Sequence, residues 1–419
     1  MATEPMKKPK ISLAIFFTLI PLLTVWLILY PPNSATKNSP HENNDSSTDP
    51  AQSSAIAVPT DWPMSRGGPQ LLGNAPVNLP DRLKLIWKYK TSDAVLSSAS
   101  IAKNRVFVGS DDNNLYALDL HSGEFIWSFA TEDSIESSPC VFQDTVFVGS
   151  SDNNIYALAV DSGTLKWKFT TENQILAGVN YLPADQNQPQ RVLIGSYDNN
   201  LYCLNAVTGL KLWTYESDSY INSTPAVADN KIIFGGCDAV LHIVSADTGQ
   251  ALRQIDAGSY IAGSAACDGR FAFVGNFENI LSCTDIQTGQ NLWEFKAQDP
   301  FFASPAVSPK KVVAASRDKN VYCFDRQSGE KLWHFTAGDS IDSSPVICND
   351  KIIFGCDDGR LYLLDLNTGR EIFTYEIGDV LSASPAIFVS PNIGAGLVIG
   401  AHDGFVYAFG PDPSVSPEE

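Results

Sequence analysis

The stretch Ser134–Phe169, SIESSPCVFQDTVFVGSSDNNIYALAVDSGTLKWKF, decides the fold of this chain. It contains four short runs rich in β-branched and aromatic residues, at positions 135–141, 145–148, 155–158 and 165–169. Turn-forming residues separate the runs, at 143–144, 149–154 and 161–163. Such runs, cut by Gly, Asn, Asp and Ser, are typical of neighbouring antiparallel strands. The stretch therefore predicts a four-stranded antiparallel sheet, whose strands we call A to D.

This unit recurs about every forty residues along the chain. A tryptophan marks one slot on strand D, and Arg253 and Phe373 fill that slot in the two copies without tryptophan. The tryptophans are Trp87, Trp127, Trp167, Trp213, Trp293 and Trp333. A second slot is acidic in every copy: Asp112, Asp152, Asp198, Asp238, Glu278, Asp318, Asp358 and Asp403. Eight small sheets in register predict an all-β, eight-bladed β-propeller.

Three positions in the unit predict how the blades fit together. Small residues begin each strand A, for example Ser137-Ser138 and Ala177-Gly178, so we expect strand A to lie nearest the crowded axis. A glycine recurs at the C–D turn, as at Gly163, because a tight hairpin there needs a positive φ. The strand D tryptophan is expected to pack as a wedge between blades, burying on the order of 150–250 Å².

The two ends of the repeat array predict how the ring closes. The eighth copy ends at Tyr407–Pro411 without a strand D. A matching strand, Leu85–Tyr89, precedes the first blade. We therefore expect this N-terminal strand to complete the last blade, which leaves no open sheet edge.

The first eighty residues differ in composition from the repeats. Residues 11–30 carry no charge and are long enough to span a bilayer, and Lys7, Lys8 and Lys10 precede them. The positive-inside rule then predicts a cytoplasmic tail at 1–10, an inner-membrane anchor at 11–30 and a propeller in the periplasm. The alternative is a cleaved signal peptide. Polar residues 31–60 predict a disordered linker, followed by a lead-in at 61–81, the propeller at 82–410 and a tail at 411–419.

Charge and cysteine content narrow the possible partners and sites. The formal net charge of −19 argues against nucleic acid as a partner of the propeller. The eight cysteines include no adjacent pair and no CxxC motif, so the sequence predicts no metal site, and we assign no disulfide. Cys203, Cys283 and Cys323 fill a strand C slot that holds alanine elsewhere, so they are expected to be small buried hydrophobic residues.

The pattern D-x-x-L-Y-A-L-D-x-x-T-G-x-x-x-W, seen with small variations in Asp112–Trp127, Asp152–Trp167 and Asp198–Trp213, resembles the pyrroloquinoline-quinone (PQQ)-type propeller repeat. The opening Asp61–Gly67 is similar to the lead-in of bacterial members of that superfamily. The resemblance covers nearly all of residues 61–410. It implies one of two branches: quinoprotein dehydrogenases, which bind PQQ with calcium, or non-enzymatic, BamB-like scaffolds of the bacterial envelope.

Several features of the chain favour the scaffold branch. The resemblance implies an adjacent Cys-Cys pair and funnel-building insertions for a dehydrogenase, and the sequence has neither. Glu136 and Asp342 are carboxylates that can face the axis, but their blades are not neighbours. We therefore predict no catalytic, cofactor-binding or metal-binding residues, and an interaction with other envelope proteins. A PQQ-dependent dehydrogenase and a propeller that binds a small ligand remain alternatives.

One sector of the propeller predicts a partner-binding patch. Strand D runs into strand A on the same face as the B–C turns, because four antiparallel strands alternate in direction. On that face, Tyr220, Tyr260 and Phe302 fall on three consecutive blades, with Phe277 on a B–C turn. In the same sector, Arg253 replaces tryptophan, and His242 and Ser282 replace a repeated tyrosine. Clustered aromatic residues suit a protein-binding hot spot, whereas the structural alternative is that they cap the seams between blades.

Overall fold

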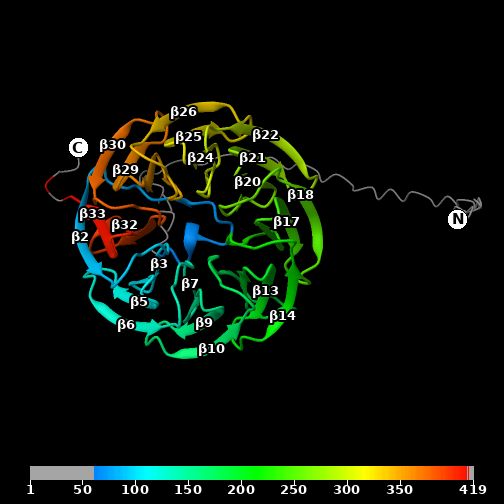
Figure 1. Cartoon of the computed structure of the whole chain (residues 1–419). Coiled ribbons are helices and arrows are strands. Elements are labelled where there is room, and N and C mark those ends of the chain that lie inside the picture. The colour runs from blue at the N-terminus through cyan, green and yellow to red at the C-terminus, as the bar shows by residue number, and fades with distance from the viewer. Residues whose placement is uncertain (1–60, 413, 415–419) are drawn as a thin grey trace, which may run out of the picture. The chain divides into compact units, whose positions relative to one another are not determined.

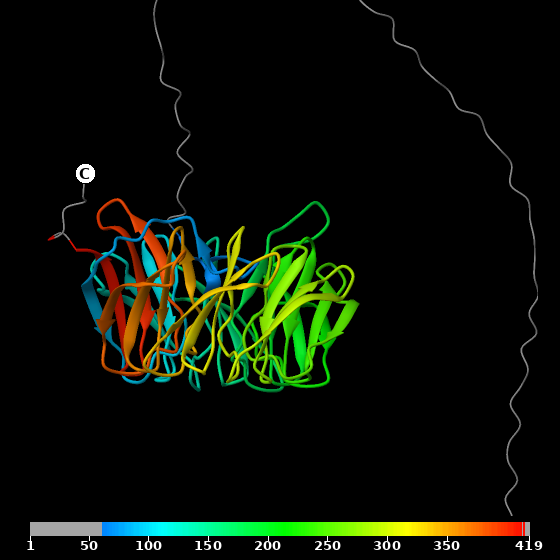
Figure 2. The ribbon, with the colours of Figure 1, turned by 90° about the horizontal axis from the view of Figure 1, so that it is seen from above.

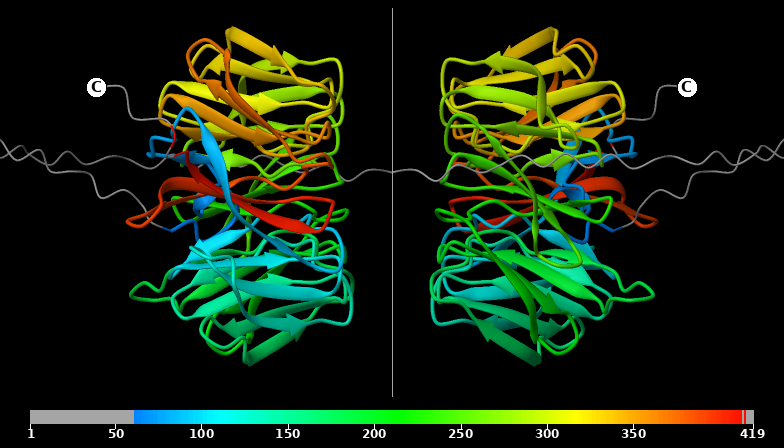
Figure 3. Two further views of the ribbon diagram at one scale, coloured as in Figure 1. Left: turned by 90° about the vertical axis from the view of Figure 1, so that its left-hand side faces the viewer. Right: turned by 90° about the vertical axis from the view of Figure 1, so that its right-hand side faces the viewer.

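The computed structural model describes residues 61–412 and 414, so the predicted tail, anchor and linker at 1–60 lie outside the described residues. In the described part, eight sheets surround a common axis and form a ring (Figure 1). Its blades stand side by side between two flat faces (Figures 2 and 3). The predicted all-β propeller with eight blades of four antiparallel strands is confirmed. Among residues 61–412, no helix is long and apolar enough to cross a membrane.

Each of the first four blades has its strands in chain order from the axis outward. Blade 1 contains β3 (Ser100–Ala102), β4 (Arg105–Gly109), β5 (Asn114–Asp119) and β6 (Phe125–Ala130). Blade 2 contains β7 (Cys140–Phe142), β8 (Thr145–Gly149), β9 (Asn154–Ala159) and β10 (Leu165–Thr170). Blade 3 contains β11 (Asn180–Leu182), β12 (Arg191–Gly195), β13 (Asn200–Asn205) and β14 (Lys211–Glu216). Blade 4 contains β15 (Ala226–Ala228), β16 (Lys231–Gly235), β17 (Val240–Ser245) and β18 (Ala251–Asp256).

The last four blades are built in the same way, except that the outermost strand of blade 8 comes from the start of the propeller. Blade 5 contains β19 (Ala266–Cys267), β20 (Phe271–Gly275), β21 (Ile280–Asp285) and β22 (Gln290–Lys296). Blade 6 contains β23 (Ala306–Val307), β24 (Lys311–Ala315), β25 (Asn320–Asp325) and β26 (Lys331–Thr336). Blade 7 contains β27 (Val346–Cys348), β28 (Lys351–Gly355), β29 (Arg360–Asp365) and β30 (Glu371–Glu376). Blade 8 contains β31 (Ala386–Ser390), β32 (Gly394–Gly400), β33 (Phe405–Pro411) and β2 (Leu83–Lys90).

The burial pattern follows from the stacking of the blades face to face. The two middle strands of a blade are covered on both faces, so Val106, Phe107 and Val108 of β4 are all fully buried. The outer strand has one face toward solvent, so in β6 the side chain of Trp127 is buried while that of Ile126 is exposed. The apolar core therefore lies in the seams between neighbouring blades.

The ring closes through its N-terminal strand, as the sequence predicts. β2 pairs antiparallel with β33, with Leu83 opposite Pro411 and Lys90 opposite Phe405. The first and last strands of the propeller therefore lie side by side at the rim (Figure 1). Because β33 has a partner on each side, blade 8 has the same four strands as the other blades and its edge is not left at β33.

Tryptophans on the outer strands fill the seams. The Trp127 indole Nε1 donates a hydrogen bond to the Val160 carbonyl of blade 2 at 3.0 Å. Its ring lies against Gly163, where a Cβ atom would come within 2.6 Å of the ring. Gly163 also has a φ of +68°, so both the ring and the backbone favour glycine there. The same ring-on-glycine contact recurs at Trp87, Trp167, Trp213, Trp293 and Trp333.

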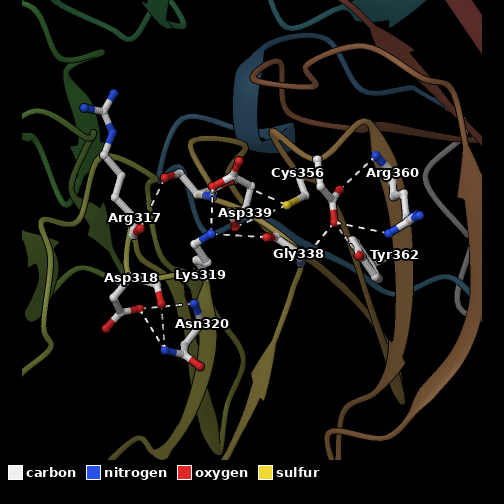
Figure 4. A network of polar contacts seen from close by, with 11 residues as sticks. Arg317, Asp318, Lys319, Asn320, Gly338, Asp339, Cys356, Arg360 and Tyr362 are labelled. Atoms are coloured by element: carbon white, nitrogen blue, oxygen red, sulfur yellow. Dashed lines mark hydrogen bonds and ion pairs between the residues drawn. The ribbon is translucent and has the colours of Figure 1, made fainter.

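In five blades the acidic slot ties the blade to the connection that enters it, through Asp112, Asp152, Asp198, Asp318 and Asp358. In blade 7, the Asp358 carboxylate accepts hydrogen bonds from the Tyr362 hydroxyl at 2.6 Å and from the Gly338 N–H at 3.0 Å (Figure 4). The same tyrosine–aspartate hydrogen bond joins Tyr116 to Asp112, Tyr156 to Asp152, Tyr202 to Asp198, Tyr322 to Asp318 and Tyr407 to Asp403. In blade 4, His242 Nε2 replaces the hydroxyl, 2.8 Å from Asp238.

Small residues next to the axis form a belt of hydrogen bonds between blades. The sequence predicts strand A at 135–141, whereas the ladder of β7 covers only Cys140–Phe142. The small residues before it bond to neighbouring blades instead: the Ser98 N–H donates to the Ser138 hydroxyl at 3.2 Å. The hydroxyls of Thr224, Ser264, Ser304, Ser344, Ser384 and Ser98 accept in the same way from the preceding blade. Gly178 has no hydroxyl and interrupts the belt.

The lead-in closes one end of the axis. Its residues include the short helix η1 (Ser65–Gly67) and β1 (Asn74–Ala75), which pairs parallel with β27. Lead-in carbonyls accept hydrogen bonds from the innermost segments of blades 1 to 7; the donors are Ile101, Val141, Asn180, Val227, Cys267, Val307 and Ile347. The lead-in lies on the face with the A–B loops, along the upper edge in Figure 2. We call this segment, residues 61–82, the plug.

Arg66 holds the centre of the plug. Its side chain is only 4% exposed, and it donates hydrogen bonds to the Pro305 carbonyl at 2.9 Å and to the Pro345 carbonyl at 2.7 Å. Burial lowers the pKa of Arg66 to about 9. One buried side chain therefore connects the lead-in to blades 6 and 7.

Candidate functional site

The face opposite the plug is built from the D–A connections and the B–C turns, and we call it the D–A face. On this face, the Phe277 N–H donates to the Tyr260 carbonyl at 2.9 Å, and the Cys237 N–H donates to the Tyr220 carbonyl at 3.0 Å. An equivalent bond is present in each of the eight blades. In each blade these bonds bring two side chains together around the axis. One is at the Tyr260 position of the D–A connection, and the other is at the Phe277 position of the B–C turn, which we call the B–C slot.

Aromatic side chains occupy these slots in blades 3 to 5, and in blade 6 Phe302 lies two residues beyond the Tyr260 slot. Phe277 lies 4.6 Å from Phe302 and 6.0 Å from Tyr260, measured between ring centroids. Tyr197 stacks on Tyr220 at 4.9 Å with an interplanar angle of 19°. Tyr220, Tyr260 and Phe277 are 46%, 53% and 40% exposed. We call these five residues the aromatic arc.

The structure brings only part of the predicted patch into one cluster. Tyr260, Phe277 and Phe302 are in contact, whereas Tyr220 pairs with Tyr197, which the sequence pattern did not single out. Tyr197 occupies the same B–C slot as Phe277, directly before the acidic residue of the repeat. A comparison of that slot across all eight copies would have found it.

Arg317 ends the aromatic arc and was also missed. It occupies the same B–C slot, and its guanidinium carbon lies 3.4 Å from the centroid of the Phe302 ring. Two hydrogen bonds, of 2.8 and 2.6 Å, hold it to the Asp342 carboxylate. Its backbone carbonyl accepts a hydrogen bond from Ser340, and the adjoining Lys319 pairs with Asp339 at 3.1 Å (Figure 4). The arginine is therefore fixed over Phe302 before any partner binds.

Carboxylates follow in blades 7, 1 and 2: Asp357 and Asp111 lie in the B–C slot of Arg317, and Asp342 and Glu136 lie in the slot of Phe302. Burial and the neighbouring Asp342 raise the pKa of Asp357 to about 6. Burial and Asp93 raise the pKa of Asp111, and burial and Asp111 raise that of Glu136. We call Asp342, Asp357, Asp111 and Glu136 the acidic arc. Glu136 and Asp342, which the sequence places on blades that are not neighbours, belong to this one series.

The acidic arc does not fit the calcium ion that the enzyme branch implies. Calcium takes about six to eight oxygen ligands. The Asp342 carboxylate is already engaged by Arg317. Within residues 61–412, no group of three or more His, Cys, Asp or Glu side chains is arranged to hold a metal ion. The expectation that the protein binds no cofactor stays a prediction.

The cysteines add no reactive site to this face. All eight lie in the described residues and are free, and seven of them are buried. Burial raises the pKa of the Cys140 and Cys348 thiols, so these groups are protonated at neutral pH. Cys237, which lies between Tyr220 and Tyr260 in the sequence, is half-buried, and burial raises the pKa of its thiol as well.

Family comparison matches most of the propeller to one model. The family model described as "Outer membrane protein assembly factor BamB" matches residues 80–185 and 237–380. A second model, the lambda-carrageenase beta-propeller domain, matches residues 141–232. No curated protein matches the chain.

Solved structures with the same fold include a BamB and two dehydrogenases. BamB from Moraxella catarrhalis is 17% identical, with a TM-score of 0.66 over 80% of this chain and 100% of that chain. A europium-containing methanol dehydrogenase is 13% identical, with a TM-score of 0.69 over 84% and 98%. Quinohemoprotein alcohol dehydrogenase from Comamonas testosteroni is 13% identical, with a TM-score of 0.72 over 87% and 83%. At these identities the likeness shows the fold alone.

Proposed function

The chain belongs to the PQQ-type repeat β-propeller family, and from this premise we propose that it is a non-catalytic, BamB-like scaffold that binds other envelope proteins. The exposed aromatic arc on the D–A face carries this proposal. Tyr220, Tyr260 and Phe277 expose large apolar surfaces on consecutive blades, and Arg317 lies over Phe302 of the same arc. Tyrosine, phenylalanine and arginine are enriched in the centres of protein interfaces.

The rigidity of the arc supports the same role. Tyr197 is stacked on Tyr220, and Arg317 is held over Phe302 by Asp342. Side chains that are already fixed lose little conformational entropy when a partner binds. The arc is therefore suited to bury its apolar area against a protein at low entropic cost.

The test is capture of the principal partner by crosslinking in cells. We expect the triple variant Tyr220→Ala, Tyr260→Ala, Phe302→Ala to lose this capture, with little change in melting temperature. The matched control replaces three exposed apolar residues away from the D–A face, Phe125, Leu165 and Leu210, by alanine. The control should capture the partner as the wild type does. Undiminished capture by the arc variant would show that the aromatic residues only cap the seams.

We also propose that residues 11–30 anchor the protein in the bacterial inner membrane, with the propeller in the periplasm. The uncharged run with lysines on one flank supports this orientation. Alkaline carbonate extraction should leave the protein in the membrane pellet. Release of a shortened protein into the soluble periplasmic fraction would instead indicate a cleaved signal peptide.

The scaffold role further implies that the propeller does not retain PQQ. The engaged carboxylate of Asp342 and the lack of an adjacent cysteine pair support this expectation. Purified protein incubated with PQQ and calcium should elute from gel filtration without the quinone absorbance. Retention at one quinone per chain would overturn the non-catalytic assignment.

A further inference from the structure

The seam between blades 4 and 5 differs from the other seams in a way that leaves space. Arg253 stands in the tryptophan slot, Ile255 in the slot of Phe129, and Ser282 in the slot of the repeated tyrosine. A cavity of about 210 Å³ lies there. Its walls come from the outer strands β17, β18, β21 and β22 and from the end of β20, on the right-hand side of the ring in Figure 1.

The lining combines apolar walls with polar groups. The apolar walls are Leu241, Ile255, Val274 and Ile280. Ser282 lies among them, and its hydroxyl has only a long hydrogen bond, of 3.4 Å, to the Val274 carbonyl. Asn291 and Glu294 add an amide and a carboxylate from β22, hydrogen-bonded to each other. The cavity thus offers a surface for a flat apolar group and hydrogen-bonding partners for a polar atom on it.

The other seams show what fits such a space. At the seam of blades 1 and 2, the ring of Tyr156 is buried next to Leu115 and lies 5.2 Å from Phe129. Its hydroxyl donates to Asp152 at 2.7 Å. Leu241, Ile255 and Ser282 occupy the same three slots at the seam of blades 4 and 5. The cavity is therefore the volume that a tyrosine ring of the chain itself fills elsewhere.

We propose that this cavity binds a tyrosine side chain of the partner protein. The inference rests on the proposed scaffold function and names the group that the partner inserts. A cavity of about 150 Å³ with apolar walls is sufficient to bind benzene, so one aromatic ring fits into this larger one. The Glu294 carboxylate and the Ser282 hydroxyl are available to the phenol hydroxyl.

The position of the cavity connects it with the aromatic arc. Gly258, on the connection that follows β18, lines the cavity and lies two residues before Tyr260. Val274 and Ile280 flank the turn that carries Phe277. A polypeptide segment that packs on Tyr260 and Phe277 therefore has the cavity next to it, at the edge of the same face. The arc supplies contact area, and the cavity selects one side chain.

The first experiment measures binding of p-cresol, the tyrosine side-chain analogue, by ligand-observed NMR. The wild type should bind it saturably with a Kd of about millimolar, as expected for so small a ligand. Ser282→Tyr restores the repeated tyrosine and fills the cavity, so the Kd should rise at least ~10-fold, or about 1.4 kcal/mol. Ser128→Tyr makes the same change at an exposed position of β6 and should bind as the wild type does. Equal binding by wild type and Ser282→Tyr would overturn the proposal.

Two further variants keep the test independent of folding. If Ser282→Tyr melts below the wild type, Val274→Phe fills the same cavity from another wall and should abolish p-cresol binding. Tyr156→Ser opens the equivalent space at the seam of blades 1 and 2 and should create a second binding site. A Val274→Phe protein that still binds p-cresol with the wild-type Kd would place the ligand elsewhere and overturn the proposal.

The second experiment asks whether the partner uses the cavity. Ser282→Tyr should reduce crosslinking to the principal partner by at least ~10-fold, since the variant removes one anchoring contact. Full capture by this variant would overturn the proposed tyrosine insertion. The triple variant of the aromatic arc tests the scaffold function separately. Loss of capture by the triple variant together with full capture by Ser282→Tyr would support the scaffold function and show that the partner does not use the cavity.

Discussion

The seam between blades 1 and 2 and the seam between blades 4 and 5 are built from the same slots with different residues. At the first, Trp127 fills the wedge position, and its indole donates to the carbonyl of Val160. At the second, Arg253 takes that position and donates from Nη2 to the Gln287 carbonyl at 2.8 Å. The hydrogen bond across the seam is kept, whereas the large apolar ring is lost.

The difference separates two kinds of repeat position. Residues that recur in most copies, such as Trp127 and Gly163, are explained by contacts within the ring. Departures from the pattern are concentrated in the blades beside the aromatic arc, where Arg253, His242 and Ser282 lie, although Phe373 in blade 7 also replaces the tryptophan. In a repeat protein, one seam can lose packing because the other seams hold the ring closed. Departures from the repeat are therefore the places to search for a binding site.

The most drastic way to break the regular seams is to remove β2. Deleting residues 1–90 takes away the plug, Trp87 and the closing strand of blade 8, and so exposes the edge of β33. We expect this protein to aggregate, whereas deletion of residues 1–60 should leave a monomer with the wild-type melting temperature. Light scattering coupled to gel filtration measures the difference. Two monomeric truncations with equal melting temperatures would show that β2 is dispensable.

A smaller effect should separate the two seams directly. Trp127→Ala removes a buried aromatic wedge and should lower the free energy of unfolding by about 3–5 kcal/mol. Arg253→Ala removes a more exposed side chain with one hydrogen bond and should cost about 1 kcal/mol or less. Urea unfolding followed by tryptophan fluorescence and by circular dichroism measures both. Equal losses would mean that the arginine packs as the tryptophan does.

The reverse substitution tests whether the seam between blades 4 and 5 still accepts a tryptophan. Arg253→Trp places an indole where Gly289, with a φ of +77°, already provides the flat surface that the other tryptophans use. We expect the free energy of unfolding to rise by about 1 kcal/mol, because apolar area is buried without displacing a side chain. A melting curve of the variant beside that of the wild type tests this. A lower melting temperature would show that the neighbouring slots have adapted to the arginine.

The smallest expected effect is a pH-dependent change in stability, and it arises in the acidic arc rather than in the aromatic arc. The pKa of Asp357 is raised to about 6, so between about pH 4 and pH 6 the group is protonated in the folded protein and ionised in the unfolded chain. Unfolding then releases a proton, and stability falls as the pH rises through this window. Asp357→Asn removes the penalty, so its melting temperature should exceed that of the wild type by about 1–3 °C at pH 7.5.

The same advantage of Asp357→Asn should disappear at pH 4, where the wild-type carboxyl is also neutral in the folded state. Glu216→Gln, on the outer rim, removes the same formal charge and controls for net charge. Differential scanning calorimetry at the two pH values provides the measurement. A stabilisation that is equal at pH 4 and pH 7.5 would rule out titration of Asp357 as its cause.

The sequence was sufficient for the parts of the fold that repeat. The number of blades, the closing strand and the turn glycines follow from short periodic patterns, and the structure agrees with them. The plug could not be predicted because it has no periodicity, and its bonds join positions far apart, such as Arg66 and Pro345. The short inner strands differ from the prediction because backbone groups near Ser138 bond to neighbouring blades rather than to a ladder.

The candidate site was predicted in part for a similar reason. Tyr260 and Phe302 stood out because their slots hold smaller residues in most copies. Tyr197 and Arg317 were missed because only one residue, Phe277, was considered from their slot. The cavity beside the arc exists because Ser282 and Ile255, on neighbouring blades, are both smaller than the aromatic residues of the repeat. Their side chains line the same cavity, which is visible only once the two blades are packed together.

The plug has a consequence for the order in which the protein is made. The hydrogen bond from Arg66 to the Pro345 carbonyl spans 279 positions, so the acceptor leaves the ribosome long after the donor. The same holds for β2, whose partner β33 is the last strand of the propeller to be synthesised. Such long-range closure is slow, because chain entropy must be lost before the contacts can form. Within the propeller, the plug and β2 are therefore made first and dock last, and the growing chain carries unpaired inner edges until blade 8 is complete.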